Sequence, residues 1–324
     1  MSRIKNNISL LAVILLLSVF VAIAIFQIDS GTPRKKARKQ VSLIVYGDDS
    51  ERWENMRQGA GLVCDEKDAD LSLLTMLSEN DVAEQEEIIV REIEDGADAL
   101  IIAACNSKEI EDFIDNGHLK IPVIFVGPVS NAKDNRNCIA LDDYQMGYDL
   151  GETIARNESD IVTVAIISDN TQRDSVALRE KGFRDAIDGK VGKIITWERS
   201  EAQAKAKTRM FIQKSIVSEA TDVIVAFDNT TTDALLDALE NLNQTSKVYS
   251  ISTSNKAVYN LYNKQIKALE YPDEFSIGYL AAMYALDRSY AQKKYSDKEI
   301  EYRIVRKENM YDKDNQTLLF PFVN

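Results

Sequence analysis

The sequence predicts an α/β protein of two doubly wound lobes, each built on a parallel sheet. Short apolar segments rich in β-branched residues alternate with amphipathic helical segments, which is the pattern of βαβ units. Some of these segments, such as Ile161–Ile167, are apolar on both faces, as expected for parallel strands buried on both sides. The chain has 324 residues. Because single hydrophobic cores stop growing at about 250–300 residues, we expect two lobes with a cleft between them.

The segments that alternate in this way follow residue 40. Asp81 is a candidate N-cap of the helix after the second strand, and Gly96 follows the end of that helix. Ligands of doubly wound folds bind beyond the carboxyl ends of the strands, so we expect the loops there to line the cleft. The predicted strands are Val41–Tyr46, Leu71–Met76, Ala99–Ala103, Val123–Val126, Ile161–Ile167, Lys193–Thr196, Val223–Phe227, Val248–Ile251 and Ile266–Leu269.

The N-terminus carries a candidate membrane anchor. The uncharged run Ile8–Ile28 is long enough to cross a bilayer core of about 30 Å as a helix, and Arg3 and Lys5 precede it. The apolar run is longer than that of a cleaved signal peptide, so we expect a cytoplasmic tip and an uncleaved transmembrane signal anchor in residues 1–30. Cleavage near Ala22–Ala24 is the alternative.

A basic linker, residues 31–40, follows the anchor. It carries five Lys and Arg against two before the span, and the positive-inside rule would therefore place the following domain in the cytoplasm. Residues 1–40 hold seven of the 39 Lys and Arg and one of the 52 Asp and Glu, so the remaining chain has a net charge of −19. Such an acidic domain is not expected to bind nucleic acid.

Five segments, taken in order, resemble the ribose/galactose-type periplasmic binding proteins, which share their fold with the ligand domain of lactose-repressor-type regulators. The resemblance is collinear over about residues 41–309. It implies two lobes that close on a small ligand, and it implies a position outside the cytoplasmic membrane. The repressors' N-terminal DNA-binding helices are replaced here by the apolar segment. The five segments are Ile121–Ile124, Ile139–Gly151, Arg179–Phe183, Val225–Leu239 and Ala268–Gly278.

The resemblance also implies a division into lobes. Its three hinge crossings fall near Leu141–Asp143, Glu270–Tyr271 and Lys293–Tyr302. The expected N-lobe is 41–142 and 271–298, and the expected C-lobe is 143–270 and 299–324.

Six residues are expected to bind the ligand because of where they stand in the resemblance. Trp53 and its neighbour Arg52 fall where the family places stacking aromatic residues, and Arg179 matches the family's ligand arginine. Asp228 and Glu270 stand in place of an asparagine and a glutamine. Ser252 stands where the family has a carboxylate. The predicted ligand-binding residues are Arg52, Trp53, Arg179, Asp228, Glu270 and Ser252.

Alternatives remain open for two of these residues. Trp53 could instead be a core residue packed with Met56 and Ala60, and Arg179 could be a solvated charge paired with Glu180 or Asp174. The family's Asp-Arg pair after the fourth strand is replaced by Gly127–Pro128. A zwitterionic, amino or otherwise modified sugar therefore fits as well as a standard pentose or hexose, and loss of ligand binding is a further alternative.

No enzyme chemistry is predicted. The chain has one histidine, no nucleophile paired with a base, no metal-ligand set and no glycine-rich phosphate loop, so no catalytic residue, metal or cofactor is expected. The prediction is a single-pass, membrane-anchored solute-binding protein on the extracytoplasmic side. It would present a sugar-like ligand to the permease of an ABC-type transporter. A sensor that passes its closed state to a membrane histidine kinase or receptor is the alternative. A cytoplasmic-facing domain or enzyme is the second alternative.

Overall fold

The computed structural model describes residues 38–47, 53–128, 138–158, 161–199, 208–240, 242, 246–291 and 300–320. Residues Lys39–Asn324 form one compact unit. Across these described ranges no helix is long and apolar enough to cross a membrane. The predicted anchor in residues 1–30, most of the predicted linker and Arg52 lie outside the described residues.

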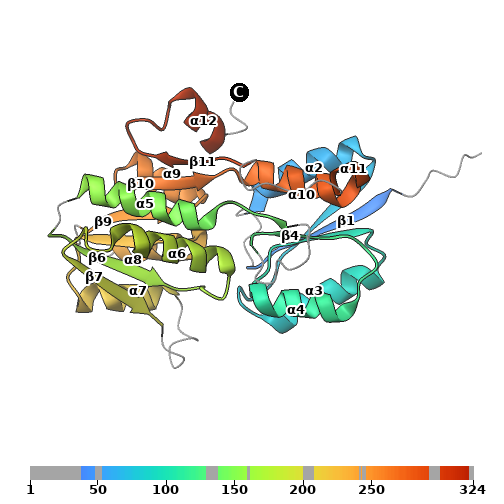
Figure 1. Ribbon diagram of the computed structural model, residues 1–324, viewed down its shortest axis with the longest axis horizontal. Coiled ribbons are helices and arrows are strands. Elements are labelled where there is room, and N and C mark those ends of the chain that lie inside the picture. Colours follow the sequence, from blue (N-terminus) through green and yellow to red (C-terminus); the bar gives the residue numbers. More distant parts are fainter. Residues whose placement is uncertain are drawn as a thin grey trace, which may run out of the picture. The chain divides into compact units, whose positions relative to one another are not determined.

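The N-terminal lobe is built on a parallel sheet with the strand order β2-β1-β3-β4-β5 (Figure 1). Successive side chains of a strand point to opposite faces, and in β1 Leu43 joins one core cluster while Ile44 joins another. The strands are β1 (Lys39–Ile44), β2 (Ala69–Leu74), β3 (Ala99–Ile102), β4 (Val123–Val126) and β5 (Cys138–Ile139).

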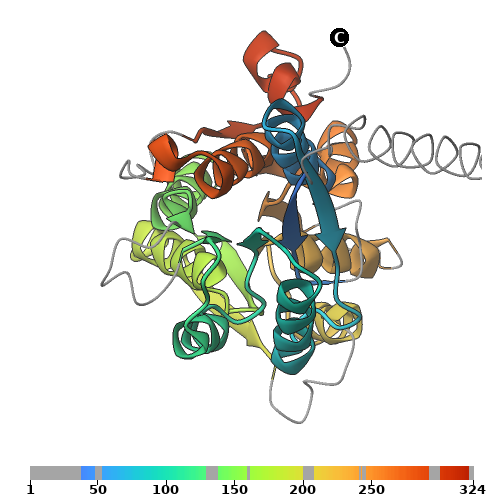
Figure 2. The ribbon, with the colours of Figure 1, turned by 90° about the vertical axis from the view of Figure 1, so that its right-hand side faces the viewer.

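Helices cover both faces of this sheet, as Figure 2 shows from the side of the N-terminal lobe. The cluster that contains Leu43 is completed by α2 and α10, and the cluster that contains Ile44 by α3 and α4. As predicted, Asp81 caps α3 by accepting a hydrogen bond from the Glu84 backbone amide at 3.1 Å. The helices are α2 (Glu54–Glu66), α3 (Val82–Glu94), α4 (Ser107–Gly117), α10 (Glu274–Leu286) and α11 (Arg288–Ala291).

The C-terminal lobe repeats this topology with the strand order β11-β10-β9-β8-β6-β7. Every pair in this order is parallel except β10 with β11, which is antiparallel. The strands are β6 (Thr163–Ser168), β7 (Lys193–Glu198), β8 (Val223–Ala226), β9 (Lys247–Ile251), β10 (Ile266–Pro272) and β11 (Tyr302–Val305).

Two layers of helices enclose the second sheet. Residues of α5 and α6 share a core cluster with one face, and residues of α7, α8 and α9 share a cluster with the other face. The helices are α5 (Asp143–Asn157), α6 (Asp174–Ile187), α7 (Thr208–Ser218), α8 (Asn229–Leu239), α9 (Asn255–Tyr262) and α12 (Lys313–Leu319).

Glycines let two pairs of helices approach closely. A Cβ atom at Gly147 of α5 would lie 1.8 Å from the carbonyl oxygen of Arg179 in α6, and one at Gly182 would lie 2.0 Å from that of Tyr144. In the other lobe, a Cβ at Gly278 of α10 would lie 1.9 Å from a backbone oxygen of α2. Each of these three glycines belongs to a segment that carries the family resemblance, and close helix packing is the physical reason for its residue type.

The nine strands predicted from the sequence are confirmed, with ends shifted by a few residues. The sequence did not predict β5, which has only two residues, or β11, a four-residue edge strand in which Arg303 interrupts the apolar pattern. The chain passes between the two sheets after β5, after β10 and again before β11. All three cysteines lie in the described part, and none of them is in a disulfide bond.

Candidate functional site

A cavity lies where strands of both lobes end. In each sheet the strand order reverses between neighbouring strands, at β1 and β3 in the first lobe and at β6 and β8 in the second. Doubly wound proteins bind ligands beyond the carboxyl ends of the strands at such a point. Residues that follow β1, β3, β4, β8 and β9 line one cavity of about 90 Å³, together with residues of α2, α6 and α10.

Aromatic rings form part of the N-terminal wall of this cavity. Tyr46 follows β1, and Trp53 directly precedes α2. Their rings meet edge to face, with centroids 4.8 Å apart, and the Trp53 indole donates a hydrogen bond to the Tyr46 carbonyl oxygen at 3.1 Å. Trp53 also belongs to a core cluster with Met56 and Ala60. Trp53 thus packs in the core, as one interpretation expected, and it also lines the cavity, while stacking on a ligand stays a prediction.

Arg179 lines the opposite wall from α6. Its Nε donates to Asp143 Oδ1 at 2.6 Å, and its Nη1 donates to the carbonyl oxygen of Phe227 at 3.0 Å. Burial raises the pKa of Asp143, and the Arg179 guanidinium opposes that shift. The proposed pairing of Arg179 with Glu180 is wrong, because Glu180 accepts from Arg184 one turn further along the helix.

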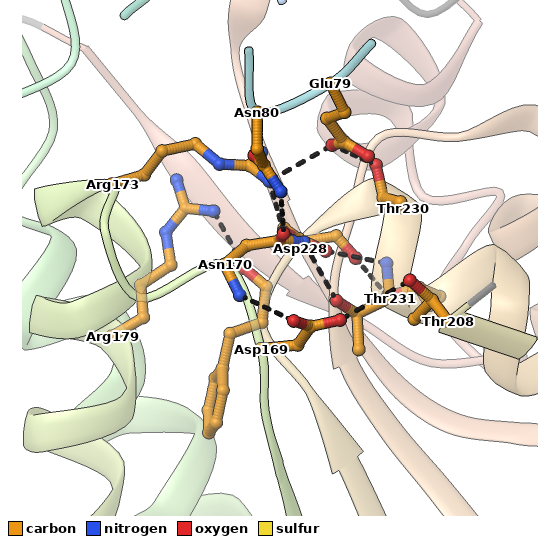
Figure 3. A network of polar contacts seen from close by, with 12 residues as sticks. Glu79, Asn80, Asp169, Asn170, Arg173, Arg179, Thr208, Asp228, Thr230 and Thr231 are labelled. Carbon is orange, nitrogen blue, oxygen red and sulfur yellow. Dashed lines mark hydrogen bonds and ion pairs between the residues drawn. The ribbon is translucent and has the colours of Figure 1, made fainter. Parts of the chain in front are cut away.

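Asp228 and Ser252 also line the cavity. Asp228 is the N-cap of α8, where its Oδ1 accepts from the Thr231 backbone amide at 2.7 Å. Its Oδ2 accepts from the Asn170 amide at 2.9 Å (Figure 3). The Ser252 hydroxyl donates to Asn229 at 3.0 Å. Asp228 thus caps a helix and lines the cavity, and Ser252 lines it two residues before Ser254, the N-cap of α9.

Glu270 is not among the residues that line the cavity. It lies in β10, is fully buried, and has no hydrogen-bond partner for either carboxylate oxygen among the described residues. Burial raises its pKa well above the usual range, and Asp149 adds to this while Arg179 opposes it. The structure therefore places Glu270 behind the site.

Arg173 was missed by the sequence analysis. It immediately precedes α6, its side chain is 2% exposed, and it lines the cavity. Its guanidinium carbon lies 4.2 Å from the centroid of the Tyr46 ring, a cation–π contact between the two lobes. Burial lowers the pKa of Arg173, but Tyr46, Asp228 and Glu79 more than offset that effect and raise it. The loop after Ile167 was expected to face the cleft, but nothing in the sequence singled out this arginine.

Polar contacts hold the two lobes together beside the cavity (Figure 3). Glu79, from the loop after β2, accepts from Arg173 Nη2 at 3.1 Å and from the Thr230 hydroxyl at 2.5 Å. The Asn80 amide donates to the side-chain oxygen of Asn170 at 3.1 Å. The lobes are therefore in direct contact at the mouth of the site, and only a small space remains between them.

The described residues also line a second, larger cavity of about 480 Å³. It is lined by residues of α2, β10, β11 and α12, among them Asn55, Tyr271 and Arg303. None of its lining residues follows β1, β3, β6 or β8, the strands at which the sheet order reverses. We therefore take the smaller cavity, shared by both lobes at that point, as the candidate site.

Two parallel-sheet lobes that share a polar and aromatic cavity define a two-lobed binding protein. Residues 41–293 match the model of a family described as periplasmic binding protein domain. The chain therefore belongs to this family, and the resemblance noted in the sequence is confirmed. No curated protein sequence matches the chain.

Solved structures show the same fold. A carbohydrate transporter solute-binding protein from Agrobacterium radiobacter, in complex with D-arabinose, is 19% identical, with a TM-score of 0.76 over 88% of this chain and 100% of that one. A solute-binding protein of an ABC transporter from Agrobacterium vitis, with bound D-fucose, is 15% identical, with a TM-score of 0.77 over 87% and 100%. A chain of the XylFII–LytSN complex is 16% identical, with a TM-score of 0.69 over 84% and 99%.

Proposed function

We propose that the chain is a membrane-anchored, extracytoplasmic solute-binding protein that captures a small, sugar-like ligand and presents it to an ABC-type transporter. The observation that carries the proposal is the cavity itself. Tyr46 and Trp53 of one lobe face Arg179 and Asp228 of the other across the point where both sheets reverse their strand order. A ligand that contacts both walls stabilises the closed arrangement of the lobes, because it binds that arrangement better than the open one.

The chemistry of the lining supports a ligand that carries several oxygens. Small-molecule sites combine apolar and aromatic walls with a few polar groups that fix orientation, and each buried hydroxyl of a ligand needs a partner. Arg179 supplies donors, Asp228 supplies acceptors, and Ser252 supplies a hydroxyl group. The Agrobacterium proteins with the same fold bind D-arabinose and D-fucose, which are sugars of this kind.

A thermal-shift screen of the full chain against sugars, sugar acids, polyols, amino sugars and nucleosides tests this proposal. We expect a ligand that raises the melting temperature. Asp228→Asn should weaken that ligand by roughly tenfold or more, because it removes a charged acceptor but keeps an N-cap residue. The matched control, Asp237→Asn, lies in the same helix and outside the cavity. A ligand that binds Asp228→Asn as tightly as the wild type would place the site elsewhere.

The division of the chain and its topology are part of the same proposal. We assign 41–142 and 271–298 to the N-lobe and 143–270 and 299–324 to the C-lobe, with the domain outside the membrane and residues 1–30 as its anchor. Membership of the periplasmic binding protein family supports this side of the membrane, while the basic linker favours the other. Protease added to intact protoplasts should digest the domain, and complete protection would refute this topology.

A sensor is the second candidate function. The likeness to a chain of the XylFII–LytSN complex favours it, because that relative in fold assembles with a second protein. In this role the closed lobes would contact a membrane histidine kinase or receptor instead of a permease. Purification of the tagged full chain from membranes with its bound partners distinguishes the two. A permease in the complex supports transport, and a kinase supports the sensor.

A further inference from the structure

The guanidinium of Arg173 is buried with part of its hydrogen-bonding capacity unused. Its Nη2 is engaged with Glu79 at 3.1 Å and lies 3.6 Å from Asp228 Oδ2. Its Nε and Nη1 have no hydrogen-bond partner within the part of the chain that the structure describes. The residue as a whole is 1% exposed, so solvent does not serve these two nitrogens.

Unpaired buried donors require an explanation. A donor left without a partner costs about 1–3 kcal/mol, and more when the group is charged, so native proteins pair nearly all of them. Arg173 cannot avoid this cost by losing its proton, because arginine stays charged in proteins. The residue lines the candidate cavity. An acceptor atom of a bound ligand would satisfy the unused donors.

Two carboxylates of the cavity wall, in contrast, already accept hydrogen bonds. Asp143 accepts from Arg179, and Asp228 accepts from a backbone amide and a side-chain amide. Glu274 lies in the first turn of α10, where the helix dipole stabilises its negative charge. Arg173 is therefore a buried cation of the cavity wall whose hydrogen-bonding capacity is partly unused, and arginine can only donate hydrogen bonds.

A carboxylate is the ligand group that matches such a cation. An ionised carboxylate only accepts hydrogen bonds, and it pairs with the planar guanidinium fork through short, charge-assisted bonds. A hydroxyl both donates and accepts, and so would use the spare donors less completely. Glu79 already illustrates the geometry, since its carboxylate oxygen lies 3.1 Å from Nη2. The guanidinium carbon also lies 4.2 Å from the centroid of the Tyr46 ring, so the cation lies against the aromatic wall of the cavity.

We propose that Arg173 binds a carboxylate of the ligand, and that the protein therefore selects a sugar acid, an aldonate or uronate, over the corresponding neutral sugar. This inference rests on the proposed function and deepens it. The cavity of about 90 Å³ is smaller than the roughly 150 Å³ that admits benzene in an engineered protein cavity. Binding of a sugar acid thus requires the lobes to part, so that the ligand carboxylate can reach Nε and Nη1 of the guanidinium.

Isothermal titration calorimetry of the full chain tests the proposal with matched probes. The acids D-galacturonate, D-glucuronate, D-gluconate and D-ribonate are compared with D-galactose, D-glucose and D-ribose. We expect at least one acid to bind roughly tenfold or more tightly than its neutral counterpart. Arg173→Gln should weaken that acid by roughly tenfold to a hundredfold and thereby reduce or abolish its preference over the neutral sugar.

Two further variants keep the test decisive. Arg173→Lys retains the charge without the planar guanidinium fork and should also weaken binding of the acid. Arg184→Gln, in the helix that Arg173 precedes but outside the cavity, should leave binding of the acid unchanged. Tight binding of a neutral sugar with no preference for its acid would overturn the inference and leave the proposed function standing. So would an acid whose affinity is the same in Arg173→Gln. Absence of binding by all acids and sugars would overturn both.

Discussion

Replacing Arg179 by methionine should destabilise the protein even in the absence of ligand. Arg179 Nε lies 2.6 Å from Asp143 Oδ1, and the Asp143 side chain is only 2% exposed. Removing one partner of a buried ion pair costs about 3–5 kcal/mol, because the remaining charge loses its compensation. The carbonyl oxygen of Phe227 loses a donor as well. We therefore expect Arg179→Met to lower the free energy of unfolding by about 3–5 kcal/mol at pH 7.

Urea unfolding of the purified full chain measures this loss, and a double-mutant cycle assigns it to the pair. Adding Asp143→Asn removes the stranded charge, so the double variant should be more stable than Arg179→Met alone. Arg184→Met is the control, because the Arg184 side chain is 35% exposed and its pair with Glu180 should contribute at most about 1 kcal/mol. A cost of Arg179→Met no larger than that of Arg184→Met would refute the reasoning.

Two other changes test the packing and the hinge. Gly147→Ala should lower the melting temperature markedly, because its Cβ would lie 1.8 Å from a backbone oxygen of α6. Gly61→Ala is the control, since a Cβ there would meet no atom nearer than 3.9 Å, and it should raise the stability by up to about 1 kcal/mol. Equal effects in calorimetric melting curves would contradict the close packing of these helices. Burial raises the pKa of Glu270, so the folded state holds a proton that the unfolded state releases. The free energy of unfolding therefore falls by about 1.4 kcal/mol for each pH unit above the ordinary glutamate pKa, until the pKa of the folded state is reached. Glu270→Gln should remove this loss, so in urea unfolding its gain in stability over the wild type should grow from pH 4.5 to pH 7. A gain that does not depend on pH, or one that the exposed control Glu87→Gln shares, would contradict this prediction.

The fold could be predicted largely because it rests on local patterns. Apolar runs such as that of β8, buried at every position, report a strand covered on both faces whatever the rest of the chain does. Capping residues such as Asp81 act within four residues of their own position. What escaped prediction depends on distant partners. The strand β11 pairs with β10 as an antiparallel edge, and three of its four residues are only partly buried.

The site was only partly predictable for a similar reason. The resemblance identified Arg179 and Asp228, and both line the cavity. Glu270 could not be judged from sequence, because successive side chains of a strand face opposite sides, and this one is buried away from the cavity lining. The role of Arg173 depends on contacts with Tyr46 and Glu79 from the other lobe. No pattern along the chain reports such a contact.

The most direct test of the central claim is a crystal structure of the full domain with the tightest-binding compound of the screen. The account predicts electron density for the compound between the two lobes, in contact with Tyr46 or Trp53 on one side and with Arg179 or Asp228 on the other. Density for the compound in the larger cavity beside Arg303, with the space between the lobes still closed, would contradict it.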